Sequence, residues 1–201
     1  DNPQEARKYL KHAEATNRYS LVHAIYSAYA NWELGNRDKA IKRLQEIVSS
    51  HNDLTWPSFL LVRLQLALDN KEAAFNRVNE LTADAPASLR LALASLLLEQ
   101  GEASRAVKLA RDCIGNDGVS ARAHMLIART FLSRGLLDLA SDQIEQALRD
   151  RPDNVDVLVL AARIAMSSKK WRDAIDYLED AKDQDPENGE IHYLLGSARM
   201  K

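Results

Sequence analysis

Small and apolar residues recur along the chain with a fixed period. Five alanines each follow a turn residue by five positions: Ala40, Ala74, Ala106, Ala140 and Ala174. Successive alanines are 34 residues apart, except that the third follows the second after 32. An apolar or small residue follows each alanine after four positions, and another after three more: Leu44 and Ile47, Val78 and Leu81, Ala110 and Cys113, Ile144 and Ala147, Leu178 and Ala181. Spacings of four and three predict one buried face of a helix in each segment.

A second helix is predicted ahead of each of these. Its core positions are Ala24, Ser27 and Ala28; Ser58, Leu61 and Val62; Arg90, Leu93 and Ala94; His124, Ile127 and Ala128; Leu158, Ala161 and Ala162. Ser120 and Asp153 are predicted N-caps of two of these helices, and Thr55 with Pro57 marks a third helix start. Gly or polar turns separate the helices of each pair, and Pro86, Pro152 and Pro186 close three of the pairs.

This pattern resembles the tetratricopeptide repeat, a family with a 34-residue unit of two helices. The segment 155–188 matches best through Trp171, Ala174, Leu178, Ala181 and Pro186. The segment 55–86 departs furthest, since Asp69 replaces the turn glycine and Leu81 replaces a small residue. The resemblance implies an all-α fold, a right-handed superhelical solenoid of antiparallel helix hairpins.

The register predicts how the chain divides. Ala6, Leu10 and Ala13 have the second-helix spacing, so residues 1–20 are expected to be the second helix of a preceding repeat. Five repeats follow, and residues 189–201 are expected to be the first helix of a truncated sixth repeat. The repeats are 21–54, 55–86, 87–120, 121–154 and 155–188. We therefore expect a single solenoid that is a fragment of a longer array, and its Ala- and Leu-rich repeats suggest a bacterial source.

Composition excludes several classes of function. The 201 residues carry a net charge of −2, with 27 basic and 29 acidic residues, and neither sign forms a long run. A nucleic-acid surface or a polybasic membrane patch is therefore not expected. The apolar stretches 89–98 and 157–166 are each broken by an arginine and are too short to span a bilayer. No signal segment is visible, and the compartment stays open between cytoplasm and periplasm.

No catalytic, metal or cofactor motif is present in the sequence. Cys113 is the single cysteine and is expected to be a small buried residue. The five histidines form no HExxH pair, and His124 and His192 recur at a repeat position where the family places a packing residue. Glycine-rich phosphate loops and the GxSxG motif are also missing. The sequence thus predicts a protein that is not an enzyme.

The family resemblance implies a concave groove, lined by positions 2, 5, 9, 12 and 13 of each first helix. The candidate partner-binding residues at these positions are Tyr29, Trp32, Phe59, Arg63, Met125, Arg129, Arg163 and Tyr193. Three of them are arginines, which could hold the carboxylates of an extended or helical ligand. Alternatively the arginines are solvated or pair with carboxylates such as Asp156 and Glu190, and the apolar positions only pack between repeats. Position 5 is never Lys and position 9 never Asn, so a clamp for a chaperone C-terminal carboxylate is not expected.

The predicted function is a non-catalytic protein–protein interaction scaffold that binds a peptide, helix or protein partner in its groove, acidic partners included. Two alternatives stay open: a scaffold module of a bacterial envelope export or assembly system for exopolysaccharide or pili, and the regulatory region of a larger enzyme.

Overall fold

The computed structural model describes residues 21–50, 55–82 and 85–201, and these residues form helices and turns only. The helices are α2 (Leu21–Glu33), α3 (Arg37–Ser50), α4 (Thr55–Ala67), α5 (Lys71–Thr82), α6 (Ala87–Glu99), α7 (Ala103–Arg111), α8 (Ser120–Ser133), α9 (Leu137–Asp150), α10 (Val155–Ser167), α11 (Trp171–Gln184) and α12 (Gly189–Arg199). The all-α prediction is confirmed. The predicted helix at residues 1–20 lies outside the described residues.

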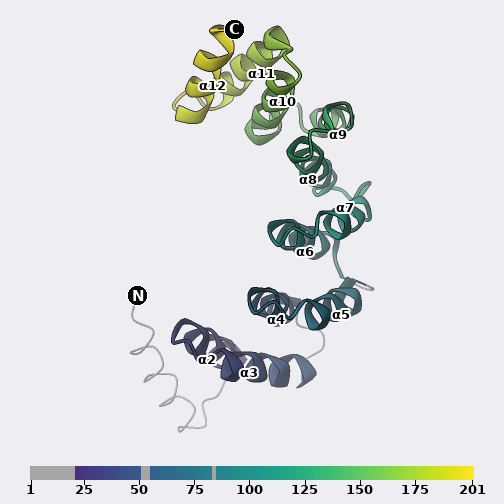
Figure 1. Cartoon of the computed structure of the whole chain (residues 1–201), viewed down its shortest axis with the longest axis vertical. Coiled ribbons are helices and arrows are strands. Elements are labelled where there is room, and N and C mark those ends of the chain that lie inside the picture. Colours follow the sequence, from purple (N-terminus) through teal and green to yellow (C-terminus); the bar gives the residue numbers. More distant parts are fainter. Residues whose placement is uncertain (1–20, 51–54, 83–84) are drawn as a thin grey trace. The chain divides into compact units, whose positions relative to one another are not determined.

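The chain divides into two compact units between Ala85 and Pro86. In the first unit, α3 packs against both α2 and α4, and α4 packs against α5. In the second unit each helix from α6 to α12 packs against the next along the chain (Figure 1). There α8 also contacts α6 and α10, so these three first helices form one layer. None of the helices within the described ranges is long and apolar enough to cross a membrane.

The turn inside each helix pair repeats the same backbone conformation. One residue per turn has a positive φ: Gly35 (77°), Asp69 (57°), Gly101 (79°), Gly135 (72°) and Lys169 (59°). The amide of the following residue donates to a carbonyl five residues back, and these N···O distances are 2.9–3.0 Å. This is the Schellman ending of a helix, in which a left-handed residue lets the chain satisfy carbonyls of the last turn. The turn therefore keeps its geometry even where glycine is absent.

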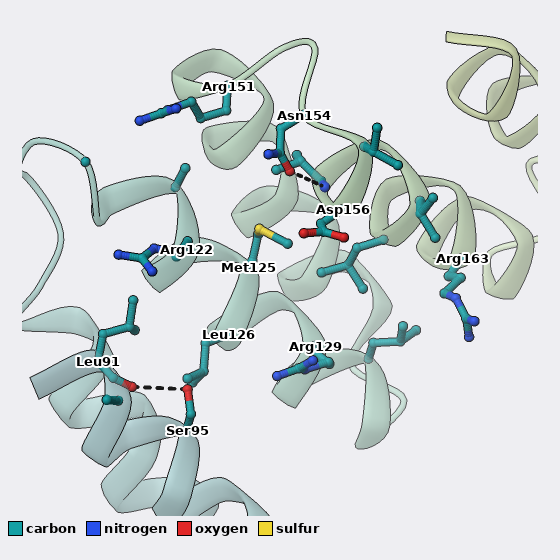
Figure 2. Close-up of a pocket in the computed structure, with 18 of the residues that line it drawn as sticks. Leu91, Ser95, Arg122, Met125, Leu126, Arg129, Arg151, Asn154, Asp156 and Arg163 are labelled. Atoms are coloured by element: carbon teal, nitrogen blue, oxygen red, sulfur yellow. Dashed lines mark hydrogen bonds between the residues drawn. The ribbon is translucent and has the colours of Figure 1, made fainter. Parts of the chain in front are cut away.

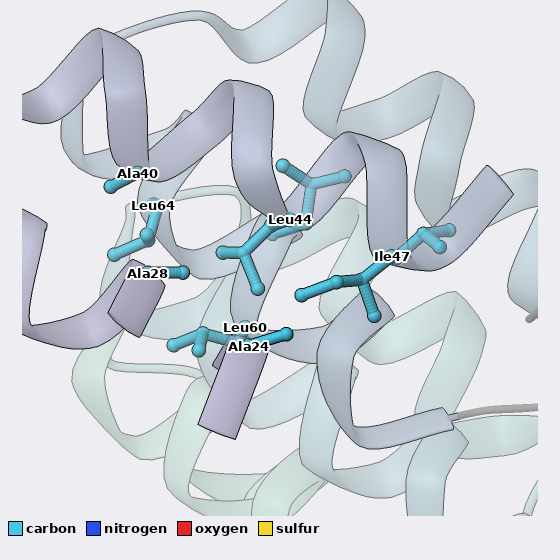
Figure 3. Close-up of a cluster of buried hydrophobic side chains, with 9 residues drawn as sticks. Ala24, Ala28, Ala40, Leu44, Ile47, Leu60 and Leu64 are labelled. Carbon is cyan, nitrogen blue, oxygen red and sulfur yellow. The ribbon is translucent and has the colours of Figure 1, made fainter. Parts of the chain in front are cut away.

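The buried faces follow the predicted spacings. All five repeating alanines are completely buried, and their four-residue neighbours are buried as well. Leu81, the large residue at a position where other repeats have small ones, is only half-buried. Figure 3 shows this packing in the first unit, where Leu44 of α3 lies among Ala24, Ala28 and Leu60 of the flanking helices. Small side chains on α2 let the larger leucines of α3 and α4 fill the space between helices.

Two predicted N-caps are wrong. Asn154, and not Asp153, caps α10, because its side-chain oxygen accepts from the Val157 amide at 3.1 Å. Ser120 is the first residue of α8, which follows Val119 without a side-chain cap. In both cases the helix begins one residue away from the position that composition alone suggested, an error common at helix ends.

The prediction that Cys113 lies on a helical face is also wrong, although its predicted burial is confirmed. Helix α7 ends at Arg111, and Cys113 lies in the turn that follows. Its thiol is fully buried and donates to the carbonyls of Leu109 (3.3 Å) and Ala87 (3.4 Å). Beyond Arg111 the amides of Cys113 and Ile114 donate to carbonyls three residues back, which is a tighter turn than that of an α-helix.

Candidate partner-binding groove

A groove of about 880 Å³ runs along the first helices of the second unit. Its walls come from α6, α8 and α10, and it reaches the N-terminal end of α12 (Figure 2). We call it the α8 groove, after its central helix. The volume is in the range of sites that hold a ligand of several residues or a drug-sized molecule.

Equivalent positions of successive helices give the groove an apolar floor. Leu91, Met125 and Val159 succeed one another at intervals of 34 residues and all line it. Leu91 is buried, and the other two are half-buried. Half-buried apolar side chains at a groove can both pack between helices and contact a ligand, so their burial is compatible with both of the roles that the sequence left open.

Four arginines surround this floor. Arg122 and Arg129 come from α8, Arg151 from the connection before α10, and Arg163 from α10. All four are exposed at the surface. The acidic side chains of the lining are Asp156 and Glu190, so the groove has an excess of positive charge.

Among the described residues, one of these arginines is paired with a carboxylate. Arg163 donates from Nη2 and Nε to Glu190 Oε1, at 2.7 and 3.3 Å. Within the part of the chain that the structure describes, the guanidinium groups of Arg122, Arg129 and Arg151 make no hydrogen bond or ion pair. Pairing with a neighbouring carboxylate thus applies to Arg163, whereas three guanidinium groups keep donors available to a ligand.

Sequence reasoning found part of this groove. Met125, Arg129 and Arg163, all predicted, lie in it together. Arg122 was not predicted, although it stands at position 2 of the repeat 121–154. Glu190, which also lines the groove, stands at position 2 of the segment 189–201. Carrying that position through the repeats would have found it. Arg151 belongs to a connection between helices and has no counterpart in the groove positions, so the pattern gave no signal for it.

The other predicted residues lie outside the α8 groove. Tyr29 (49% exposed), Trp32, Phe59 and Arg63 belong to α2 and α4 of the first unit. Trp32 is half-buried beneath the Arg37 guanidinium, which lies 5.4 Å from its ring centroid. Exposed Tyr26 and Trp56 add to the aromatic character of these helices and were not predicted.

Tyr193 on α12 is 73% exposed and does not line the groove.

The two histidines at the expected packing position differ. His124 is buried, and its Nδ1 lies 3.0 Å from Gln143 Oε1, as a structural residue would. His192 is exposed, with Nε2 2.7 Å from the Pro186 carbonyl oxygen, so its predicted packing role is wrong. The described ranges contain no group of three His, Cys, Asp or Glu side chains that could hold a metal ion.

Solved structures similar to this chain are repeat proteins of low sequence identity. The C-terminal part of a TPR repeat-containing protein from Cytophaga hutchinsonii has a TM-score of 0.70 at 15% identity, over 98% of this chain and 80% of that one. YrrB, a TPR protein with an unusual peptide-binding site, has a TM-score of 0.58 at 15% identity, over 96% and 98%. The APC/C hetero-tetramer Cut9–Hcn1 gives 0.60 at 17% identity, over 98% of this chain but 39% of that one. The present chain thus spans well under half of that protein's length. No curated protein matches the sequence.

Family models settle the classification. Models described as tetratricopeptide repeat match residues 25–52, 91–155 and 131–198, which together cover more than half of the chain. With the similar solved structures, they confirm an all-α helical-repeat solenoid. Repeats of this family generally mediate protein–protein interactions and are generally not catalytic. The chain belongs to the tetratricopeptide repeat family.

Proposed function

We propose that this protein is a non-catalytic scaffold that binds an acidic segment of a partner protein in the α8 groove. The observation that carries the proposal is the set of three arginines around an apolar floor, Arg122, Arg129 and Arg151, whose side chains have no carboxylate partner in the described ranges. The predicted repeats 87–120, 121–154 and 155–188 each contribute one first helix to this groove. The similarity to YrrB, a TPR protein with an unusual peptide-binding site, supports this kind of ligand.

The lining favours an amphipathic ligand. Met125 and Val159 offer half-buried apolar surface at the floor, where leucine-like side chains of a partner could be buried. Arginine guanidinium groups bind carboxylates with two parallel hydrogen bonds, which fixes both the position and the orientation of the ligand. A segment that combines acidic and apolar side chains can therefore use both the arginines and the floor of the groove.

Selection from a displayed peptide library, with the whole chain as bait, tests the proposal. We expect the recovered peptides to be enriched in Glu and Asp next to apolar residues. One recovered peptide, labelled with fluorescein, then serves as the probe in anisotropy titrations. Binding should weaken as salt is added, because the charges lie at an open surface.

A groove variant, R122Q/R129Q/R151Q, should reduce the affinity for this probe at least about tenfold, since each charged contact is worth about 1 kcal/mol or more. The matched control is R134Q/R149Q/R172Q, which removes the same charge from exposed arginines outside the groove. Circular dichroism verifies that both variants keep their helices. Equal loss in both variants, or recovery of peptides without acidic residues, would show that the groove does not bind an acidic segment.

A further inference from the structure

One face of α11 carries a row of exposed carboxylates. The row, here called the α11 ridge, consists of Asp173, Asp176, Asp180 and Asp183. At 3.6 residues per turn, these four positions fall within about 80° of the helix circumference. Arg172 lies beside the ridge and offsets one of its charges. None of these residues lines the α8 groove, so the ridge and the groove are separate surfaces of the same unit.

The spacing of charges on the ridge matches that in the groove. Arg122 and Arg129 are seven residues apart on α8, which is about 10.5 Å along a helix. Asp176 and Asp183 are also seven residues apart on α11. A helix laid along α8 can therefore place one carboxylate against each arginine. Two charge pairs in register also fix the position of one helix along the other.

We propose that the α8 groove receives the α11 ridge of a second copy of this chain. The inference rests on the proposed function, because it names a partner for the same groove. Ridge and groove are different surfaces, so the contact is head-to-tail and leaves one of each free in a pair of chains. Further copies add at the free surfaces, and short oligomers grow with concentration. The ridge is short and charged, so the association is weak and is reduced by salt.

Sedimentation velocity of the whole chain over a range of concentrations measures this association. At low ionic strength the average sedimentation coefficient should rise with protein concentration. At about 1 M salt, where the Debye length is about 3 Å, it should stay at the monomer value. A coefficient that is independent of concentration at low ionic strength would overturn the proposal.

Two charge-reversal variants assign the surfaces. The groove variant R122E/R129E and the ridge variant D176K/D183K should each lose self-association at least about tenfold. An equimolar mixture of the two should associate again, because the intact ridge of the first faces the intact groove of the second. The control D142K/E145K changes the net charge as the ridge variant does, on exposed positions of α9, and should associate like the wild type. Failure of the mixture to associate, or equal loss in the control, would overturn the assignment.

The acidic-peptide probe separates this inference from the function on which it rests. The ridge variant should still bind the peptide, and the peptide should dissociate wild-type oligomers by occupying the groove. A wild-type chain that binds the peptide and stays monomeric would refute self-docking while leaving the proposed function intact. A chain that neither binds the peptide nor self-associates would refute both.

Discussion

Arg163 on α10 donates to Glu190 at the first turn of α12, with 2.7 Å between Nη2 and Oε1. The pair joins the first helices of two consecutive repeats. Arg163 and Glu190 are 27 residues apart in sequence. It lies at the end of the α8 groove, and each side chain is about half exposed. One arginine of the groove is therefore paired within the protein itself, whereas the side chains of the three others have no partner in the part of the chain that the structure describes.

Releasing Arg163 should strengthen the binding of acidic ligands. The substitution Glu190→Gln removes the competing carboxylate and one negative charge from the groove. We expect the affinity for an acidic peptide to rise roughly two- to fivefold, the range of an exposed ion pair. Anisotropy titration with a labelled acidic peptide measures the change.

Glu187→Gln is the matched control for this experiment, because Glu187 is exposed in the connection just before α12 but does not line the groove. It should leave the affinity unchanged. The unfolding free energy of Glu190→Gln should fall by less than about 1 kcal/mol, as for other exposed pairs. Unchanged peptide affinity in this variant would mean that Arg163 does not contact the ligand.

The turn residue Lys169 is predicted to be a site of stored backbone strain. Its φ of 59° is a left-handed conformation that costs a residue with a Cβ about 1–2 kcal/mol. Lys169→Gly should stabilise the protein by roughly 0.5–1 kcal/mol, because the greater freedom of glycine in the unfolded chain offsets part of the gain. Urea unfolding measures the difference.

The reverse substitution at an equivalent turn tests the same idea. Gly135 has φ 72°, and a Cβ added there meets no atom within 4 Å. Gly135→Ala should therefore destabilise through backbone strain alone, by about 1 kcal/mol. Destabilisation by Lys169→Gly would show that its side chain contributes more than the strain costs.

The repeat register explains which parts of the fold could be predicted. Ala140 and Ala174 recur because a fully buried position between helices admits only a small side chain, and that constraint is visible in the sequence. The same register finds the turn at Lys169, although lysine has no preference for positive φ. Tertiary packing fixes where the two helices end, and the residue between them adopts a positive φ whatever its type.

The repeat register does not predict every feature of the groove and its surroundings. Arg151 reaches the groove from a connection, and connections do not share the periodic environment of helices. The pairing of Arg163 with Glu190 was one of two alternatives, because the sequence does not fix rotamers of exposed side chains. Helix α7 ends earlier than the spacing predicts, because the amides of Cys113 and Ile114 donate to carbonyls three residues back, a tighter turn that the apolar spacing does not reveal.

Leu178 is predicted to be essential to the second unit. It is completely buried and belongs to a cluster in which α12 contributes Ile191 and Leu194. Leu178→Ala should cost about 2–5 kcal/mol, through lost burial and the cavity that remains. The control Leu139→Ala, at a position 47% exposed on α9, should cost much less. Chemical unfolding measures the free energy of unfolding of both variants, and equal losses would contradict the burial of Leu178.

The thiol of Cys113 is predicted to react slowly in the folded protein. Burial raises the pKa of Cys113; the Arg90 guanidinium opposes this and the Asp112 carboxylate adds to it. At a given pH the folded chain therefore has less thiolate, the reactive form, than the unfolded chain. Labelling with dithionitrobenzoate should be slow in buffer and fast in urea. Comparable rates in both would mean that the thiol is accessible.

The same shift has a consequence for stability. The thiol of the folded chain releases its proton at a higher pH than that of the unfolded chain. Its contribution to the free energy of unfolding is therefore fully present below the unfolded pKa. It is lost as the pH rises through the folded pKa, since the unfolded state then binds fewer protons. Cys113→Ala should remove this part of the alkaline loss of stability, seen as a flatter profile of unfolding free energy above neutral pH. An unchanged slope would assign the alkaline loss to other groups.

Asn154 links the stability of α10 to the shape of the groove. Its side-chain oxygen caps the helix at the Val157 amide, and the residue itself lines the groove beside Asp156. Asn154→Ala should lower the unfolding free energy by about 1 kcal/mol, and Asn154→Ser should restore most of it, because serine also caps helices. Asp153→Ala, one residue earlier, should have little effect, since that side chain does not cap the helix. A larger loss of unfolding free energy from Asp153→Ala than from Asn154→Ala would assign the cap to Asp153, the residue that the sequence suggested. If the first turn of α10 also positions Asp156 and Val159 at the groove, Asn154→Ala should weaken binding of the acidic peptide, and Asn154→Ser should recover it together with stability.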